Sequence, residues 1–168
     1  SDLTLEDGAV CEYDKCIYAL GSHFFVPPFG GNDDPRVKTI RTIRDIEEIR
    51  TFLEKGKRAV VIGGGVVGLE AAWELKQYGC DVTVLEAMPA LMANKLDPVA
   101  SAMLQGFFEE GSVKILAGAM TDRYENGTIY LKDGTALPAD VVVVSAGVRA
   151  NGQLAADAGA EQNKAVVV

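Results

Sequence analysis

The residues whose types and spacing suit ligand binding form a glycine turn near the middle of the chain. The turn has the pattern G-x-G-x-x-G, and an acidic residue, Glu86, follows eighteen positions after its last glycine. A β-branched run at 59–62 precedes the turn, and residues 69–78 have the character of a helix that ends at Gly79. Strand, glycine turn, helix, strand and acid in this order predict a dinucleotide-binding site. The turn consists of Gly63, Gly64, Gly65, Val66, Val67 and Gly68.

Each part of this pattern has a physical reason. Gly63 permits a tight turn from strand to helix, and Gly68 lets the helix lie close to its strand. Because Gly65 has no side chain, a pyrophosphate can approach the backbone amides at the positive end of the helix dipole. Glu86 has the spacing of a carboxylate that binds the two ribose hydroxyls of the adenosine.

The residues beside Glu86 indicate which dinucleotide is preferred. Ala87 and Met88 follow it, so no Arg or Lys stands there to offset a 2′-phosphate. We therefore predict NAD(H) rather than NADP(H) as the bound cofactor. The alternative is a glycine-rich turn in some other α/β protein, which leaves Glu86 unexplained.

Composition and charge exclude several classes of partner. The chain of 168 residues has 16 Lys and Arg against 24 Asp and Glu, which gives a net charge of −8. This charge argues against nucleic acid or an anionic membrane as partner. No apolar run reaches the roughly 18 residues that a membrane span needs. We expect a cytoplasmic protein.

Few residues suggest catalysis or metal binding. Cys11 and Cys16 have the C-x4-C spacing of some redox disulfides, but we interpret them, like Cys80, as small buried apolar residues. His23, the only histidine, is interpreted as a solvated loop residue. No metal-site spacing occurs, and we assign no residue of the chain as a catalytic acid, base or nucleophile.

The first third of the chain predicts a β-hairpin, a linker and a helix. Residues 3–20 alternate around a turn at Asp7-Gly8, and the apolar part of 13–22 is expected to form a strand that runs into a glycine. Residues 24–35, rich in Pro, Gly, Asn and Asp, suggest an extended linker. Thr42 is expected to cap a helix that reaches about Lys55.

The remainder predicts a helix, a meander and a buried strand. Asp97 is expected to cap a helix over 98–110 that starts with proline. A short strand at 113–116 precedes a meander with turns at 126–127 and 133–134, and a valine strand at 141–145 ends in Ala146 and Gly147. The predicted core residues of the 98–110 helix are Val99, Met103, Leu104, Phe107 and Phe108.

These elements predict the fold class. It is α/β, a doubly wound, Rossmann-like parallel sheet in which an antiparallel meander replaces one crossover helix, with an N-terminal hairpin and linker added. Ligands of such sheets bind at the carboxyl ends of the strands. Gly147 there is expected to let the nicotinamide ribose pass close to the backbone, beside Ala146.

Four stretches together resemble the pyridine-nucleotide-binding domain of the FAD-dependent pyridine nucleotide-disulfide oxidoreductases. They match that family's patterns YDxLIIATGS, PPxxG and VVIGGGxxGxEA, and a fourth pattern that begins with an Asp-Gly turn and continues through a valine-rich strand to a glycine. Residues 91–97 are similar to a stretch of rubredoxin reductases and of nitrite reductase large subunits. The chain departs from the patterns at Leu20, Phe24 and Ala150. The four stretches are Asp14–Ser22, Pro27–Gly30, Val60–Ala71 and Leu131–Gly147.

The resemblance implies a domain division and a role. Residues 1–35 would be a remnant of a flanking FAD-domain segment with a linker, 36–150 the NAD(H)-binding domain, and 151–168 a return segment toward the FAD domain. The chain would be a piece excised from a longer flavoenzyme, inactive by itself, with FAD bound only in the full-length parent. Glu70 matches a glutamate near the nicotinamide; the alternative is an acid in the first helical turn that stabilises the dipole.

In that parent, NADH would deliver hydride to the flavin, and the flavin would pass electrons to rubredoxin, a siroheme domain, a disulfide or oxygen. The missing FAD and interface domains would then be partners of this chain. Two other functions stay open at this point. One is a self-sufficient dehydrogenase, and the other is a non-catalytic domain that senses NAD(H) or mediates an interaction.

Overall fold

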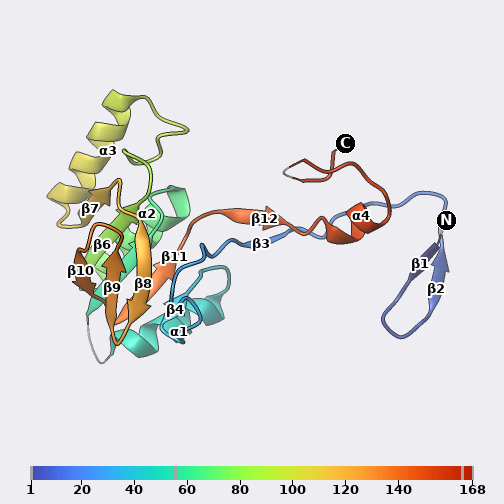
Figure 1. Ribbon diagram of the computed structural model, residues 1–168, viewed down its shortest axis with the longest axis horizontal. Coiled ribbons are helices and arrows are strands. Elements are labelled where there is room, and N and C mark those ends of the chain that lie inside the picture. The colour runs from blue at the N-terminus through green and yellow to red at the C-terminus, as the bar shows by residue number, and fades with distance from the viewer. Residues whose placement is uncertain (1, 55–56, 164, 168) are drawn as a thin grey trace. The chain divides into compact units, whose positions relative to one another are not determined.

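Five parallel strands form the centre of the computed structural model, which describes residues 2–54, 57–163 and 165–167 (Figure 1). Every neighbouring pair in this sheet runs parallel. The sheet order differs from the chain order, because β11, the last strand of this sheet along the chain, inserts beside β5. The strands, in their order across the sheet, are β4 (Val37–Lys38), β11 (Val141–Val144), β5 (Arg58–Ile62), β6 (Asp81–Glu86) and β7 (Lys114–Ala117).

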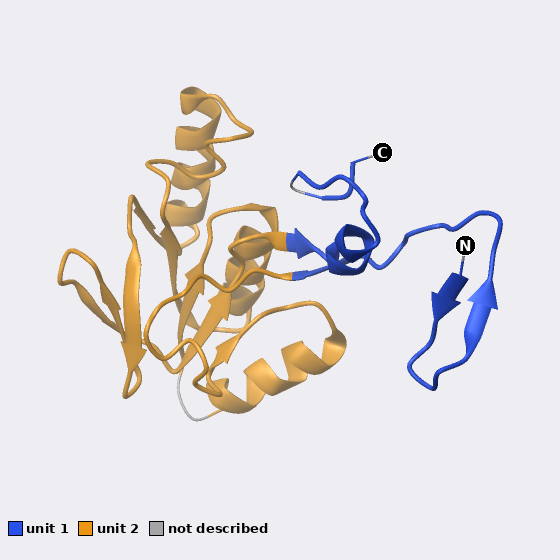
Figure 2. Ribbon diagram, turned by 45° about the vertical axis from the view of Figure 1, so that its right-hand side comes forward, with its two compact units in different colours: residues 1–23, 149–168 blue, residues 24–148 orange. Residues whose placement is uncertain are grey.

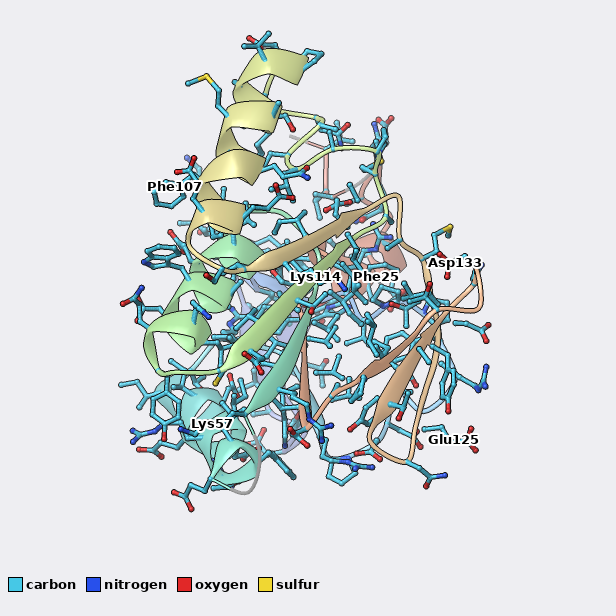
Figure 3. All side chains as sticks on the ribbon, turned by 90° about the vertical axis from the view of Figure 1, so that its left-hand side faces the viewer. Phe25, Lys57, Phe107, Lys114, Glu125 and Asp133 are labelled. Atoms are coloured by element: carbon cyan, nitrogen blue, oxygen red, sulfur yellow. The ribbon has the colours of Figure 1, made fainter. Side chains whose placement is uncertain are left out.

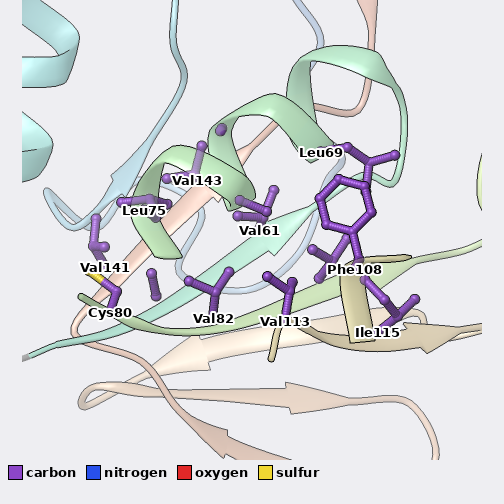
Figure 4. Packing of buried hydrophobic residues seen from close by; sticks show 14 of the residues in the cluster. Val61, Leu69, Leu75, Cys80, Val82, Phe108, Val113, Ile115, Val141 and Val143 are labelled. Carbon is purple, nitrogen blue, oxygen red and sulfur yellow. The ribbon is translucent and has the colours of Figure 1, made fainter. Parts of the chain in front are cut away.

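Alternate residues of the central strands enter two different hydrophobic cores. Val61 and Val143 pack with the helices, whereas Val60 and Val142 pack with the meander on the other face. Figure 4 shows the helical side, with Leu69 and Leu75 above the strands. Since both faces are covered, the strands are near-continuous runs of buried apolar residues, as parallel sheets require.

Three helices accompany the sheet. They are α1 (Ile43–Leu53), α2 (Val66–Gln77) and α3 (Pro98–Glu110). Two of them begin after the caps predicted from the sequence, Thr42 and Asp97, whereas the helix predicted at 69–78 begins three residues earlier, at Val66. Thr42 forms a capping box with Asp45, and the Asp97 carboxylate accepts from the amide of Ala100. Lys55, where we expected α1 to end, lies outside the described residues.

The meander covers the second face of the sheet, where a crossover helix would otherwise lie. It consists of β8 (Thr121–Glu125), β9 (Thr128–Leu131) and β10 (Ala136–Pro138), all antiparallel. The turn at Asn126 and Gly127 has positive φ at both positions, the geometry that matches strand twist in tight hairpins. Glu125 and Asp133 mark the two turn ends of the meander in Figure 3. The predicted fold class is confirmed.

The apolar face of α3 is less buried than the sequence predicted. Leu104 and Phe108 do pack against the core, but Val99, Met103 and Phe107 are 71%, 72% and 56% exposed. The helix accompanies β7, the edge strand, so only one side of it meets other elements. Phe107, labelled in Figure 3, lies beside the ring of Trp73 on α2, with 5.2 Å between the ring centroids, and still keeps more than half of its surface exposed. The prediction that all five residues are core was therefore wrong for three of them.

The chain divides into two compact units, residues 1–23 with 149–168 and residues 24–148 (Figure 2). In the smaller unit, β1 (Asp2–Thr4) and β2 (Val10–Glu12) form the expected hairpin, and α4 (Gln153–Asp157) is a short helix. The strands β3 (Ser22–Phe24) and β12 (Val148–Ala150) pair where the units join in sequence. The functional division into 1–35, 36–150 and 151–168 stays a prediction.

One expectation for the N-terminal region was wrong. Residues 13–21 form no strand, and Ile17 is 92% exposed, because no strand among the described residues pairs with this segment. The predicted linker at 24–35 is irregular, and two of its residues contact the meander. Phe29 is buried in the meander core, and Gly30 bridges to Arg123.

An ion pair joins the beginnings of the two central strands. Arg58 donates from Nη2 and Nε to the two carboxylate oxygens of Asp140, at 2.6 and 2.8 Å, and its backbone amide donates to the same carboxylate. These hydrogen bonds from Arg58 lower the pKa of the Asp140 carboxyl, against the opposing effect of burial.

We predict that Asp140→Asn makes the protein less sensitive to acid. Between the lowered pKa of folded Asp140 and the value of about 3.9 in the unfolded chain, only the unfolded chain binds the proton. The free energy of unfolding therefore falls as pH decreases through that window, and the contribution is complete above it. Urea unfolding measured between pH 3 and 7 should show that the free energy of unfolding falls less on acidification in the variant than in the wild type.

The control for this experiment is Asp81→Asn. Asp81 is exposed and forms no ion pair in the described part of the chain. Its variant should keep the wild-type acid dependence. Equal acid dependence in wild type and Asp140→Asn would contradict the assignment.

Candidate functional site

The carboxyl ends of three adjacent strands bring the predicted site residues to one edge of the sheet. Gly63 follows β5, Glu86 is the last residue of β6, and Ala146 and Gly147 lie just beyond β11. Because β5 lies between β11 and β6, the glycine turn stands between the other two groups. Site residues predicted from separate parts of the sequence therefore lie at the same edge of the sheet.

Close packing explains two glycines of the turn. Gly63 has φ of +112°, and a Cβ there would lie 2.3 Å from the carbonyl oxygen of Ser145. A Cβ on Gly68 would lie 2.0 Å from the carbonyl oxygen of Gly63. The first contact brings the turn against the end of β11, and the second brings α2 against the end of β5.

Gly65 differs, because a Cβ at this position would meet nothing within 4 Å. It is the N-cap of α2 and provides no side-chain hydrogen bond to the helix. The first amides of a helix lack intrahelical acceptors, and the dipole makes this end positive. Val66 and Val67, in the first turn, are half-exposed. The open space and the uncapped amides fit a pyrophosphate.

The carboxylate of Glu86 is held beside the glycine turn by backbone amides. Oε2 accepts from the amide of Gly64 at 2.7 Å, and Oε1 accepts from the amide of Met88 at 2.7 Å. Each carboxylate oxygen has further acceptor capacity. The residue is partly exposed.

The remaining predicted residues occupy the same edge at less defined positions. Gly147 is exposed with φ of +103°, and its carbonyl accepts from the amide of Phe25. Ala146 is partly buried against the meander core. Glu70 is exposed on α2 and is its fifth residue, so the alternative reading as a first-turn acid does not apply.

Two residues that sequence reasoning did not select also support this edge. Leu91 is fully buried, and its Cδ2 lies 2.5 Å from where a Cβ on Gly64 would be. Ser101, on α3, donates to the carbonyl of Leu91 at 2.6 Å. The only sequence signal for Ser101 was a serine in line with Leu104 and Phe108 at helical spacing.

The other reactive side chains belong to the smaller unit or are buried. Cys11, Cys16 and His23 belong to the smaller unit. Both Cys11 and Cys16 are exposed, so their predicted burial was wrong; they lie in or beside a two-stranded hairpin that has no core of its own. Cys80 is buried as predicted, and burial raises the pKa of its thiol.

No helix in the described ranges is both long and apolar enough to span a bilayer.

Comparison with known proteins places this architecture among redox enzymes. A family model described as pyridine nucleotide-disulphide oxidoreductase matches residues 1–168. The nitrite reductase (NAD(P)H) of Bacillus subtilis is 38% identical over 162 residues, which cover 93% of this chain and 20% of that protein.

Solved structures of redox enzymes have the same fold. The ferredoxin reductase for the CYP199A2 system from Rhodopseudomonas palustris has a TM-score of 0.93 and 29% identity, over 99% of this chain and 43% of that chain. An FAD-dependent pyridine nucleotide-disulphide oxidoreductase from Desulfovibrio vulgaris has a TM-score of 0.79 and 32% identity, over 95% and 42%. The chain thus spans from 20% to 43% of the length of these relatives.

The two contrasting glycines give a test of the geometry of the turn. We predict that Gly68→Ala lowers the free energy of unfolding by about 1–3 kcal/mol, because its Cβ forces α2 away from Gly63. Gly65→Ala should change it by no more than about 0.5 kcal/mol, since its backbone conformation is allowed and the space is open. Urea unfolding followed by the fluorescence of Trp73, the only tryptophan, measures both. Equal losses in the two variants would contradict the packing described.

Proposed function

Because the chain belongs to the pyridine nucleotide-disulphide oxidoreductase family, we propose that it binds NADH and presents the nicotinamide for hydride transfer to a flavin. The observation that carries the proposal is the pairing of an uncapped, open helix N-terminus at Gly65 with the fixed carboxylate of Glu86. A dinucleotide has a pyrophosphate for the first of these groups and an adenosine ribose for the second.

In this proposal the glycine turn binds the pyrophosphate. The amides of the first turn of α2, residues 66–68, donate to phosphate oxygens, and the helix dipole adds to the attraction. The net charge of −8 works against a multiply charged anion at long range. Binding therefore depends on these short, directed contacts at the helix end.

Glu86 is proposed to read the adenosine ribose. One lone pair of each carboxylate oxygen is used by Gly64 or Met88, which leaves the others for the 2′- and 3′-hydroxyls. A 2′-phosphate in the same place would face the carboxylate at close range. Like charges at such a distance repel strongly in a partly buried site, so NADH is preferred over NADPH.

The nicotinamide end is proposed to lie toward β11. Gly147 lets the second ribose approach the backbone, Ala146 lines its path, and Glu70 orients the carboxamide. When bound, NADH supplies the hydride and a flavin receives it. The residues of this chain bind and orient, and none is proposed as an acid, base or nucleophile.

The longer reaction is proposed from the relatives. Among them are a nitrite reductase and a ferredoxin reductase, and an FAD-dependent enzyme is among the solved structures. We propose that the parent activity is an FAD-dependent NADH oxidoreductase that passes electrons to a redox acceptor, such as a small iron–sulfur or rubredoxin-like protein or a siroheme domain.

Calorimetric titration with NADH and NADPH tests the binding proposal. We expect saturable NADH binding with a Kd between micromolar and low millimolar, roughly 4–8 kcal/mol, and NADPH binding weaker by at least about tenfold. Glu86→Arg should reverse the preference, because a guanidinium attracts the 2′-phosphate and no longer accepts from the ribose. Gly65→Ala should weaken both nucleotides together.

The matched control is Glu110→Arg, which makes the same charge change at an exposed position at the far end of α3. It should keep the wild-type preference. If wild type binds neither nucleotide, the proposal fails. Oxidation of NADH with a small substrate and no added flavin would instead favour a self-sufficient dehydrogenase.

A further inference from the structure

The loop that follows Glu86, residues 87–97, has no helix or strand but is firmly held at several points. The carbonyl of Met88 accepts from the amide of Gly118, and the carbonyl of Glu86 accepts from that of Ala119. Leu91 is fully buried under Gly64. The loop is therefore attached at its start to the residues that follow β7, and at its middle to the glycine turn.

Ser101 makes the remaining attachment. Its side chain is polar and yet only 3% exposed. Its hydroxyl donates to the carbonyl of Leu91 at 2.6 Å rather than to a carbonyl of its own helix. A buried hydroxyl on an otherwise apolar helix side is retained at a cost unless it is hydrogen-bonded.

Three of these residues form a closed circuit, and Ser101 is attached to it through Leu91. Ser101 holds Leu91, Leu91 packs under Gly64, and Gly64 donates to Glu86. The covalent loop from Glu86 to Leu91 completes the circuit, with the amide of Met88 bonded to the second oxygen of Glu86. Movement of Leu91 therefore changes the support of the carboxylate through both the glycine turn and the loop.

We propose that Ser101 is a positioning residue for nucleotide discrimination. By fixing Leu91 it holds the loop so that the Glu86 carboxylate stands where it accepts from a ribose and repels a 2′-phosphate. The inference rests on the proposed NADH binding. Ser101 itself is too buried to touch a nucleotide, so any effect on selectivity must pass through the loop. Binding groups need such support, since a small displacement loosens the geometry on which they depend.

The test compares the chain with its Ser101→Ala variant in two measurements. Titration should show that the ratio of the NADPH Kd to the NADH Kd falls by at least about threefold in the variant. Hydrogen exchange should show faster exchange of the Met88 amide, which donates to Glu86, while the amides of β5 keep their protection. A purely structural serine would lower thermal stability and leave the ratio unchanged.

Ile129→Val is the matched control. Ile129 is fully buried in the meander core, on the other face of the sheet from Leu91 and Ser101. The variant should lower stability without changing the ratio. If it changes the ratio as much as Ser101→Ala does, general loosening explains the effect and the inference is overturned.

Two outcomes separate this inference from the proposed function. If wild type does not discriminate between the nucleotides, both are overturned. If wild type prefers NADH and Ser101→Ala keeps its full preference, only the role of Ser101 is overturned. If Ser101→Ala fails to fold, the same two measurements are made on Ser101→Cys, which has a weaker donor and a similar shape. An unchanged Kd ratio and unchanged exchange of the Met88 amide in that variant also reject the inference.

Discussion

The contact on which the site depends is the close approach of α2 to the end of β5. The carbonyl of Gly63 occupies the space where a side chain at residue 68 would stand, and the same turn lies against Ser145 at the end of β11. Because three backbone segments meet without side chains between them, the N-terminus of α2 is fixed at the edge of the sheet. A helix dipole directed at that edge is useful for binding only if the helix cannot move away.

This constraint explains how the sheet order serves the site. The meander returns the chain to the opposite side of β5, so β11 and β6 flank the glycine turn. The acidic residue comes from one neighbour and the exposed Gly147 from the other. A dinucleotide is long and has chemically different ends, and an edge with different groups on the two sides of a central anion site matches that asymmetry.

The support of Glu86 shows a different kind of organisation. Its carboxylate is held by the backbone amides of Gly64 and Met88. Backbone donors orient the carboxylate without cancelling its charge, so it keeps the negative charge that distinguishes a ribose from a 2′-phosphate. The buried leucine and serine beneath it carry no charge, and they act through shape and one hydrogen bond.

The sequence alone determined the features that depend on local chemistry. Thr42 and Asp97 cap helices, Asn126-Gly127 makes a tight turn, and the glycine turn joins strand to helix, because each depends on residues within a few positions. Only the tertiary structure decided which apolar residues are buried. Phe107 and Ile17 are exposed because burial requires a neighbouring element that the periodicity of one segment does not reveal. The role of Ser101 was equally hidden, since its partner Leu91 lies in an irregular loop ten residues away, and no local pattern specifies that meeting.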